Sequence, residues 1–201
     1  YNISDCYLTT GSGNTGSFYT LSNEPAAQAA SLSCNASAYN QIDLTFPSIT
    51  AAGITNADGY IILQKIGSAP TGLPSDAASY TVGATVGDAT VAAIVNSTSA
   101  ATQSITGLTA STNYYYTLIP YNALGTGTIA ATYNYLITGS IPGSNCTTPV
   151  TPPGITVSAS TLTGFTYVQS AGPSASQTYN VSGTNLTPAS GNINIAASAN
   201  Y

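Results

Sequence analysis

The sequence predicts an all-β fold. Short runs in which apolar and polar residues alternate recur along the chain, and each is bounded by Gly, Asn, Ser or Thr. Fifteen tyrosines and many Ile, Leu and Val lie among Ser, Thr, Asn, Gly and Ala, a mixture that favours strands joined by polar turns. No window combines a sustained helical period with capping residues. An apolar fraction of 43 % is enough to build packed cores.

The predicted strands follow one another along the chain from Pro25. The first two lie around 30–34 and 42–46. The third, 60–66, places Tyr60 and Ile62 on one face and Ile61 and Leu63 on the other. The stretch 69–79 contains Pro70, Gly72 and Pro74, so we expect a long connection there. Further strands are expected at 80–86, 90–95, 103–105, 114–121 and 133–141.

Composition divides the chain into four parts. Residues 1–24 are rich in Gly, Ser and Thr and are interpreted as a linker or the end of a preceding module. A first β module occupies 25–147, and a Pro-rich linker, 148–154, follows it. Residues 155–201 alternate again but offer only three or four strands, about half of a sandwich. We expect the missing half to come from residues beyond Tyr201 or from a neighbour.

Charged groups are scarce. The charged residues are Asp5, Glu24, Asp43, Asp58, Lys65, Asp76 and Asp88, and the chain has no His. No activated nucleophile can be assembled from these groups, so the sequence predicts no enzyme and no cofactor. One lysine cannot neutralise a phosphate backbone, which argues against nucleic acid as a partner. No apolar run reaches the about 20 residues that span a bilayer, so we expect no membrane insertion by this segment.

The aspartates offer two candidate functional sites. Asp58, Asp76 and Asp88 could supply oxygen ligands to calcium, but no dense aspartate motif supports a metal site. Asp43 and Asp58 could form a pair of glycosidase type. Exposed strand and turn positions explain both residues better, and we therefore predict no catalytic or metal-binding residue.

Three cysteines, Cys6, Cys34 and Cys146, are too widely spaced for a zinc site and favour a disulfide. The odd count leaves one sulfur whose partner lies outside a single internal pair. A disulfide in turn favours a secreted, extracellular or cell-surface location. Candidate N-glycosylation triplets agree weakly with export, although unmodified surface asparagines explain them better, because many such triplets arise by chance in a chain rich in Asn, Ser and Thr; they begin at Asn2, Asn35, Asn96, Asn145, Asn180 and Asn185.

The segment 107–125 resembles the E–F corner and F strand of a fibronectin type III domain. Its residues are Gly-Leu-Thr-Ala-Ser-Thr-Asn-Tyr-Tyr-Tyr-Thr-Leu-Ile-Pro-Tyr-Asn-Ala-Leu-Gly, with Leu108, Tyr114, Tyr116 and Leu118 at the family's alternating positions. The resemblance covers about 25–145. It implies a β-sandwich in which Tyr114 is the tyrosine-corner residue and Phe46 takes the place of the usual strand-B tryptophan.

Two further features resemble secreted multidomain surface proteins of Bacteroidetes-type bacteria. The connection 69–95 is longer than is usual in the family, and 162–187 is similar to the opening of a second immunoglobulin-like module. Both module types are scaffolds, so neither resemblance implies a ligand. The overall expectation is a fibronectin type III or immunoglobulin-like sandwich, a Pro-rich linker and a partial second sandwich.

The resemblance also bears on the cysteines. In that topology the first and last strands run in the same direction, which implies that Cys34 and Cys146 meet at one pole and form the internal disulfide. Cys6 would then bond to a preceding module or to another chain. The alternative is a free, buried Cys34, since cysteine is also a common core residue.

Two functions of different classes follow. The first is a non-catalytic structural or adhesive segment of a secreted cell-surface protein that self-associates into a filament, adhesin or stalk, with copies of itself or adjoining modules as partners. The alternative is a carbohydrate-binding accessory module of a secreted hydrolase, with glycans as partners. Tyr115, Tyr133 and Tyr135 are the candidate interface residues, because exposed tyrosines suit both protein contacts and stacking on sugars.

Overall fold

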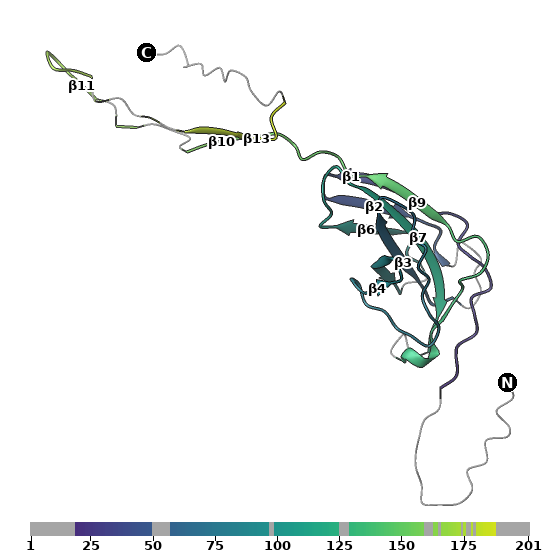
Figure 1. The fold of residues 1–201 in the computed structure, drawn as a ribbon. Coiled ribbons are helices and arrows are strands. Elements are labelled where there is room, and N and C mark those ends of the chain that lie inside the picture. Colours follow the sequence, from purple (N-terminus) through teal and green to yellow (C-terminus); the bar gives the residue numbers. More distant parts are fainter. Residues whose placement is uncertain are drawn as a thin grey trace, which may run out of the picture.

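The computed structural model describes residues 19–49, 57–96, 99–124, 129–158, 163–164, 166–173, 175, 178 and 180–187. They form a β-sandwich followed by short hairpins that extend beyond it (Figure 1). Among these residues, ordered structure consists almost entirely of strands, with one 3₁₀ helix, η3 (Ala130–Thr132). The predicted all-β fold is confirmed.

The sandwich contains a three-stranded and a six-stranded sheet. The first has the order β1 (Ser33–Ala38), β2 (Gln41–Thr45), β6 (Thr102–Thr106). The second has the order β4 (Thr85–Val86), β5 (Ala89–Val95), β3 (Gly59–Ile66), β7 (Asn113–Asn122), β8 (Asn134–Tyr135), and β9 (Gly143–Thr147) pairs with the other half of β7. All pairs are antiparallel. In the usual strand letters of such sandwiches, the three-stranded sheet is A–B–E and the six-stranded sheet contains C′–C–F–G.

One core lies between the two sheets. Ile42 and Leu44 of β2 are fully buried there against Tyr60 and Ile62 of β3. Phe46 follows β2 and makes an edge-on contact with Tyr60, with ring centroids 5.5 Å apart. The aromatic residue expected at this position therefore fills the centre of the sandwich. Burying such side chains is the main favourable contribution to folding.

A second core lies on the outer face of the six-stranded sheet. Ile61 and Leu63 are as fully buried as their neighbours on the other face of β3. Tyr80 from the connection before β4, Tyr133 immediately before β8 and Tyr135 from β8 itself pack on this face. The six-stranded sheet is thus covered on both sides, which explains why β3 is a continuous apolar run instead of a polar and apolar alternation.

Two predicted strands are shorter than expected. The prediction of a strand over 80–86 is correct only for β4, because the connection before it folds back over the sheet. The prediction over 133–141 was also wrong beyond β8: the chain loops out after Leu136 and returns to β7 at Pro142. Gly139 within this excursion has φ +82°, a conformation that leaves the strand geometry.

Beyond the sandwich, β10 (Gly154–Val157) pairs with β13 (Val181–Thr184), and β11 (Tyr167–Val168) pairs with β12 (Gly172–Pro173). Apolar side chains here are exposed, among them Ile155 at 61 % and Tyr167 at 75 %. That 155–201 belongs to a second sandwich stays a prediction. Four apolar residues of the alternating pattern in 155–201 lie outside the described residues, namely Phe165, Tyr179, Ile193 and Ile195.

Candidate functional site

The first and last strands of the sandwich are joined by a disulfide between Cys34 and Cys146, whose Cα atoms are 6.1 Å apart. Cys34 lies in β1 of the three-stranded sheet and Cys146 in β9 of the six-stranded sheet. The bond therefore closes one edge of the sandwich covalently. It confirms the implied pairing and excludes the alternative of a free, buried Cys34. Cys6 lies outside the described residues.

Tyr114 ties the start of β7 to the turn before it. Its hydroxyl accepts a hydrogen bond from the main-chain amide of Thr109 at 2.9 Å, and its ring is 4 % exposed. This five-residue return is the geometry of a tyrosine corner.

The chain leaves the sandwich beside that corner, and Thr148 fixes the exit. Its hydroxyl donates to the carbonyl of Thr109 at 2.6 Å and accepts from the amide of Thr112 at 3.0 Å. Thr148 is 2 % exposed. No periodic signal marked this residue in the sequence, because its partners lie 36 and 39 positions away.

The chain enters the sandwich along the opposite side of the structure, as an irregular segment, residues 19–30, here called the N-terminal strap (Figure 1). The amide of Ser22 donates to the carbonyl of Thr132 at 2.9 Å. Side-chain amides supply the next contacts: Asn134 donates to the carbonyl of Ser22 and Asn122 to that of Asn23, both at 2.8 Å. Residues 19–24 were expected to be linker, but the structure binds them to the module.

Gln28 holds the strap to the excursion between β8 and β9. Its Nε2 donates to the carbonyl of Leu136 at 2.6 Å and to that of Thr138 at 2.9 Å. Two carbonyls that no strand partner could satisfy are thereby paired. The sequence did not predict this contact, because polar side chains that could make it occur throughout the chain.

Three aspartates fix loops or polar side chains. Asp58 accepts a hydrogen bond from the amide of Ala123, and Asp76 accepts one from the amide of Tyr135, both at 2.8 Å. Asp43 lies on the outer face of β2, where hydrogen bonds from Ser104, Ser37 and Gln41 lower its pKa below the usual value. These carboxylates are engaged in holding the fold and are not arranged around a shared centre.

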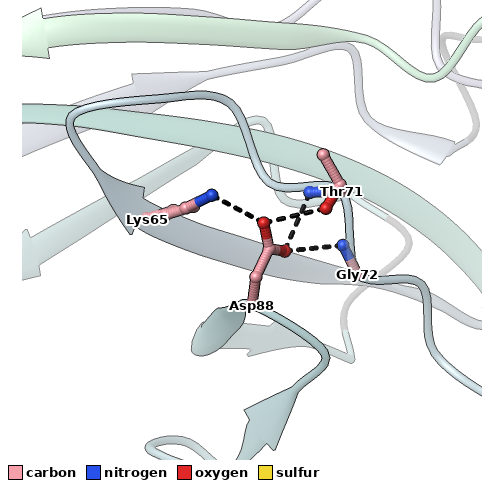
Figure 2. A network of polar contacts seen from close by, with 4 residues as sticks. All are labelled: Lys65, Thr71, Gly72 and Asp88. Carbon is pink, nitrogen blue, oxygen red and sulfur yellow. Dashed lines mark hydrogen bonds and ion pairs between the residues drawn. The ribbon is translucent and has the colours of Figure 1, made fainter.

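Asp88 is the centre of the densest polar network (Figure 2). One oxygen receives Nζ of Lys65 at 2.6 Å and the hydroxyl of Thr71 at 2.8 Å; the other receives the amides of Thr71 and Gly72 at 2.9 and 2.7 Å. The bond from Lys65, followed by those from Thr71 and Gly72, holds the Asp88 pKa far below its usual range. The network fastens the long connection after β3 to the turn between β4 and β5.

The geometry at Gly72 allows this attachment. A β carbon at that position would lie 2.1 Å from the carbonyl oxygen of Val86, so only glycine permits the close approach of the two main chains. The pair of Lys65 and Asp88 is partly open to solvent, with side chains 28 % and 33 % exposed. This ion pair helps to attach the connection that follows β3 to the turn between β4 and β5.

The aspartates weighed as calcium ligands do not converge. Among the residues that the structure describes, no three His, Cys, Asp or Glu side chains come together as a metal site. Asp58, Asp76 and Asp88 bind three different loops instead.

The tyrosines on the outer face form a packed aromatic cluster. Tyr133 and Tyr135 stack with centroids 5.6 Å apart, and Tyr121 lies 5.2 Å from Tyr133. Tyr133 is 7 % and Tyr135 is 1 % exposed. The prediction that these two rings present an interface or a sugar platform was wrong, because the period-2 pattern showed that they share a face but not that a loop closes over it.

Burial sets the acid–base behaviour of this cluster. Desolvation, with the neighbouring tyrosines and Asp76 as smaller causes, raises the pKa of Tyr135 well above the usual value of a phenol. The same effect raises the pKa of Tyr121 and Tyr133. These hydroxyls stay neutral at physiological pH and serve as packing and hydrogen-bonding groups.

Of the candidate interface tyrosines, only Tyr115 retains part of its surface. It lies half-buried on β7 between Lys65 and Asn145 of the neighbouring strands. Asn113 donates to its hydroxyl at 3.4 Å.

The candidate glycosylation sites that the structure describes are all exposed; they are Asn35, Asn96, Asn145, Asn180 and Asn185. Asn2 lies outside the described residues. Asn96 accepts a hydrogen bond from the Tyr121 hydroxyl through Oδ1, which leaves its nitrogen outside that contact. Glycan attachment at these positions stays a prediction.

A search of the described residues for a helix with the length and apolarity needed to cross a bilayer finds no such helix.

No protein-family model and no curated protein matches the chain. Solved structures do. The strand order described above, with sheets A–B–E and C′–C–F–G, decides the fold. It is a β-sandwich of fibronectin type III-like architecture. One similar structure is the third fibronectin III domain of human KIAA0343 protein, with 14 % identity and TM-score 0.42; the match covers 71 % of this chain and 96 % of that one. Another is the fn3 domain of human contactin 1, with 11 % identity and TM-score 0.41; the match covers 73 % of this chain and 98 % of that one.

The FN1–FN3 domains of chicken CNTN1 are a further similar structure, with 14 % identity and TM-score 0.37. The match covers 63 % of this chain and 31 % of that one, so the chain spans about a third of that fragment's length. At these identities the likeness concerns the fibronectin type III fold and nothing beyond it.

Proposed function

We propose that this chain is a non-catalytic structural or adhesive segment of a secreted surface protein, and that its modules pack against one another or against further copies in a filament or stalk. The proposal includes the division into a module at 25–147, a Pro-rich linker at 148–154 and a second module at 155–201.

The observation that carries the proposal is the scarcity of charged side chains and their engagement within the fold. Each described aspartate accepts hydrogen bonds within the fold, and Lys65, the one cation among the side chains, is bound to Asp88. Only Asp88 is neutralised by a cation, and the other acids keep their charge, but a net charge of −5 over 201 residues is a weak source of long-range repulsion between copies. The exposed side chains are mainly Ser, Thr and Asn, which lose less on desolvation than ions do.

The disulfide supports the proposed location, because such bonds persist in oxidising compartments outside the cytosol. The competing glycan-binding function has lost two of its three candidate rings, since Tyr133 and Tyr135 are buried. Tyr115 is the remaining ring on which it can be tested.

Self-association is tested by analytical ultracentrifugation over a wide range of protein concentration, together with electron microscopy of native material. We expect larger species to grow with concentration at physiological ionic strength and filaments or linear arrays in the micrographs. A chain that stays monomeric at the highest concentration would contradict the assembly. Saturable binding to a glycan array that disappears in Tyr115→Ala would favour the accessory module instead.

A further inference from the structure

The disulfide joins the first and the last strand of the sandwich. Cys34 is the second residue of β1, and Cys146 is the fourth residue of β9. The 112 residue steps between them contain every other strand of the sandwich and nearly all of its two cores. A loop of that length is closed by two Cα atoms that are 6.1 Å apart.

We propose that the Cys34–Cys146 bond carries tension between the two ends of the module and shields the enclosed strands from it. This goes beyond the proposed function, because it concerns one chain and holds whether or not copies assemble. It would give a segment that links other modules a resistance to pulling that its hydrogen bonds alone do not supply.

Tension applied to the two ends of the module is carried by the shortest covalent path between them. A force applied to the N-terminal strap and to the Pro-rich linker reaches Cys34 from one side and Cys146 from the other. The shortest covalent connection between these residues is the bond between their sulfurs, so the chain from Asn35 to Asn145 is slack. Breaking a β ladder inside that loop does not lengthen the tethered path, and tension therefore gains nothing from unfolding the sandwich.

The N-terminal strap lies outside the loop and is the part that yields. Its attachments to the module are individual hydrogen bonds, chiefly from the side chains of Asn122, Asn134 and Gln28. It has no continuous ladder with a neighbouring strand. Peeling 19–33 away releases roughly 50 Å of chain, at about 3.3–3.6 Å per extended residue.

Reduction of the bond changes the response. The enclosed 112 steps then become part of the tethered path. Full unfolding adds roughly 390 Å at about 3.5 Å per residue. The oxidised and reduced chains thus differ by several-fold in the length they can release, which makes the module's extensibility dependent on the redox state.

The test is single-molecule force spectroscopy on the full 201-residue chain, held by its two ends, with Cys6→Ser so that the pair under study is the only one that can form. Peptide mapping under non-reducing conditions verifies the bond. We expect the oxidised chain to show only short releases, and the same molecule to show the long release after addition of a reducing agent. The Cys34→Ser, Cys146→Ser double variant should show it without reductant, provided circular dichroism confirms that it folds.

A long release in the oxidised chain would overturn the inference, since the load would then pass through the strands. A reduced chain that never gives the long release would overturn it as well, because the strands would then resist the load without the bond. Failure of the chain to assemble in ultracentrifugation leaves both readouts unchanged, so this test and that of the proposed function are separate.

Discussion

Two main-chain amides join Thr112 and Thr148, and the Thr148 hydroxyl adds a third hydrogen bond, to the carbonyl of Thr112 at 3.2 Å. The amide of Thr148 donates to the carbonyl of Thr112, and the amide of Thr112 donates to Oγ1 of Thr148, each at 3.0 Å. The first bond continues the pairing of β7 with β9 by one residue, and the second replaces a ladder bond with a side chain. The end of the module is thereby fixed immediately before the Pro-rich linker.

Replacing Thr148 by valine should destabilise the sandwich. The substitution keeps the shape of the side chain but leaves the partly buried amide of Thr112 and the carbonyl of Thr109 without their hydroxyl partner. An unsatisfied buried group costs about 1–3 kcal/mol. Denaturant titration measures the change in the free energy of unfolding. Thr147→Val is the matched control, because Thr147 is exposed on β9 and its loss should change stability by less than about 0.5 kcal/mol.

Asp88→Asn should make the stability less dependent on pH in acid. The folded state holds the Asp88 pKa far below 3.8, its ordinary value, so the unfolded chain takes up the proton first as the pH falls. The stabilisation is complete above the unfolded pKa and is lost progressively below it. Comparing denaturation midpoints at about pH 6 and about pH 2.5 should therefore show a smaller fall in the variant than in the parent chain.

Glu24→Gln provides the control for this pH comparison. Glu24 is an exposed acid at the start of the module, so its replacement removes a charge without removing the Asp88 network. An Asp88→Asn profile that is as steep in acid as that of the parent would contradict the role of the network.

The buried tyrosines should ionise late when the folded protein is titrated with base. Burial raises the pKa of Tyr60 to about 12, and raises the pKa of Tyr116 and Tyr135 further. Because the folded state favours the neutral phenol, this stability is present below about pH 10, where unfolded tyrosine ionises, and is lost as the pH rises through the folded values.

Absorbance of the phenolate near 295 nm follows that titration. We expect a first group of tyrosines and a later, steep step that coincides with loss of the circular dichroism of the fold. In denaturant a single step near pH 10 should replace both. A single step in the native protein would mean that the rings of Tyr60 and Tyr135 reach solvent.

Substitutions of Tyr135 test how much the aromatic cluster on the outer face of the six-stranded sheet contributes to stability. Tyr135→Ala empties a fully buried aromatic site and should cost about 3–5 kcal/mol, whereas Tyr135→Phe loses only the hydrogen bond to the carbonyl of Ala78 and should cost about 1 kcal/mol. Denaturant titration distinguishes the two. Tyr115→Ala, at a half-buried position of β7, should cost less than Tyr135→Ala. Equal effects at both positions would show that the cover contributes nothing to stability.

Local patterns in the sequence were sufficient to predict most strands of the central sandwich, but the bounds predicted for β1, β4 and β8 were wrong. Tyr60 and Ile62 alternate with Ile61 and Leu63, and the structure places the two pairs in different cores as the alternation required. The resemblance of 107–125 to a fibronectin type III domain implied a tyrosine corner at Tyr114, and its hydroxyl does bind upstream main chain. The internal disulfide followed from the same resemblance.

The candidate site was less accessible to sequence reasoning. Alternation placed Tyr133 and Tyr135 on a common face, but exposure depends on what lies over that face, and the covering connections have no periodic pattern. Gln28 meets Leu136 across 108 positions, and such a contact between common polar residues leaves no local signature.

The sequence by itself determined that this chain builds β structure with hardly any charged chemistry, because strand periodicity and composition are local properties of the residues. The tertiary structure alone decided how the ends and the outer face are closed. Strap, disulfide and aromatic cover each join segments that are distant along the chain, and the free energy of such contacts depends on a geometry that exists only once the two sheets have packed.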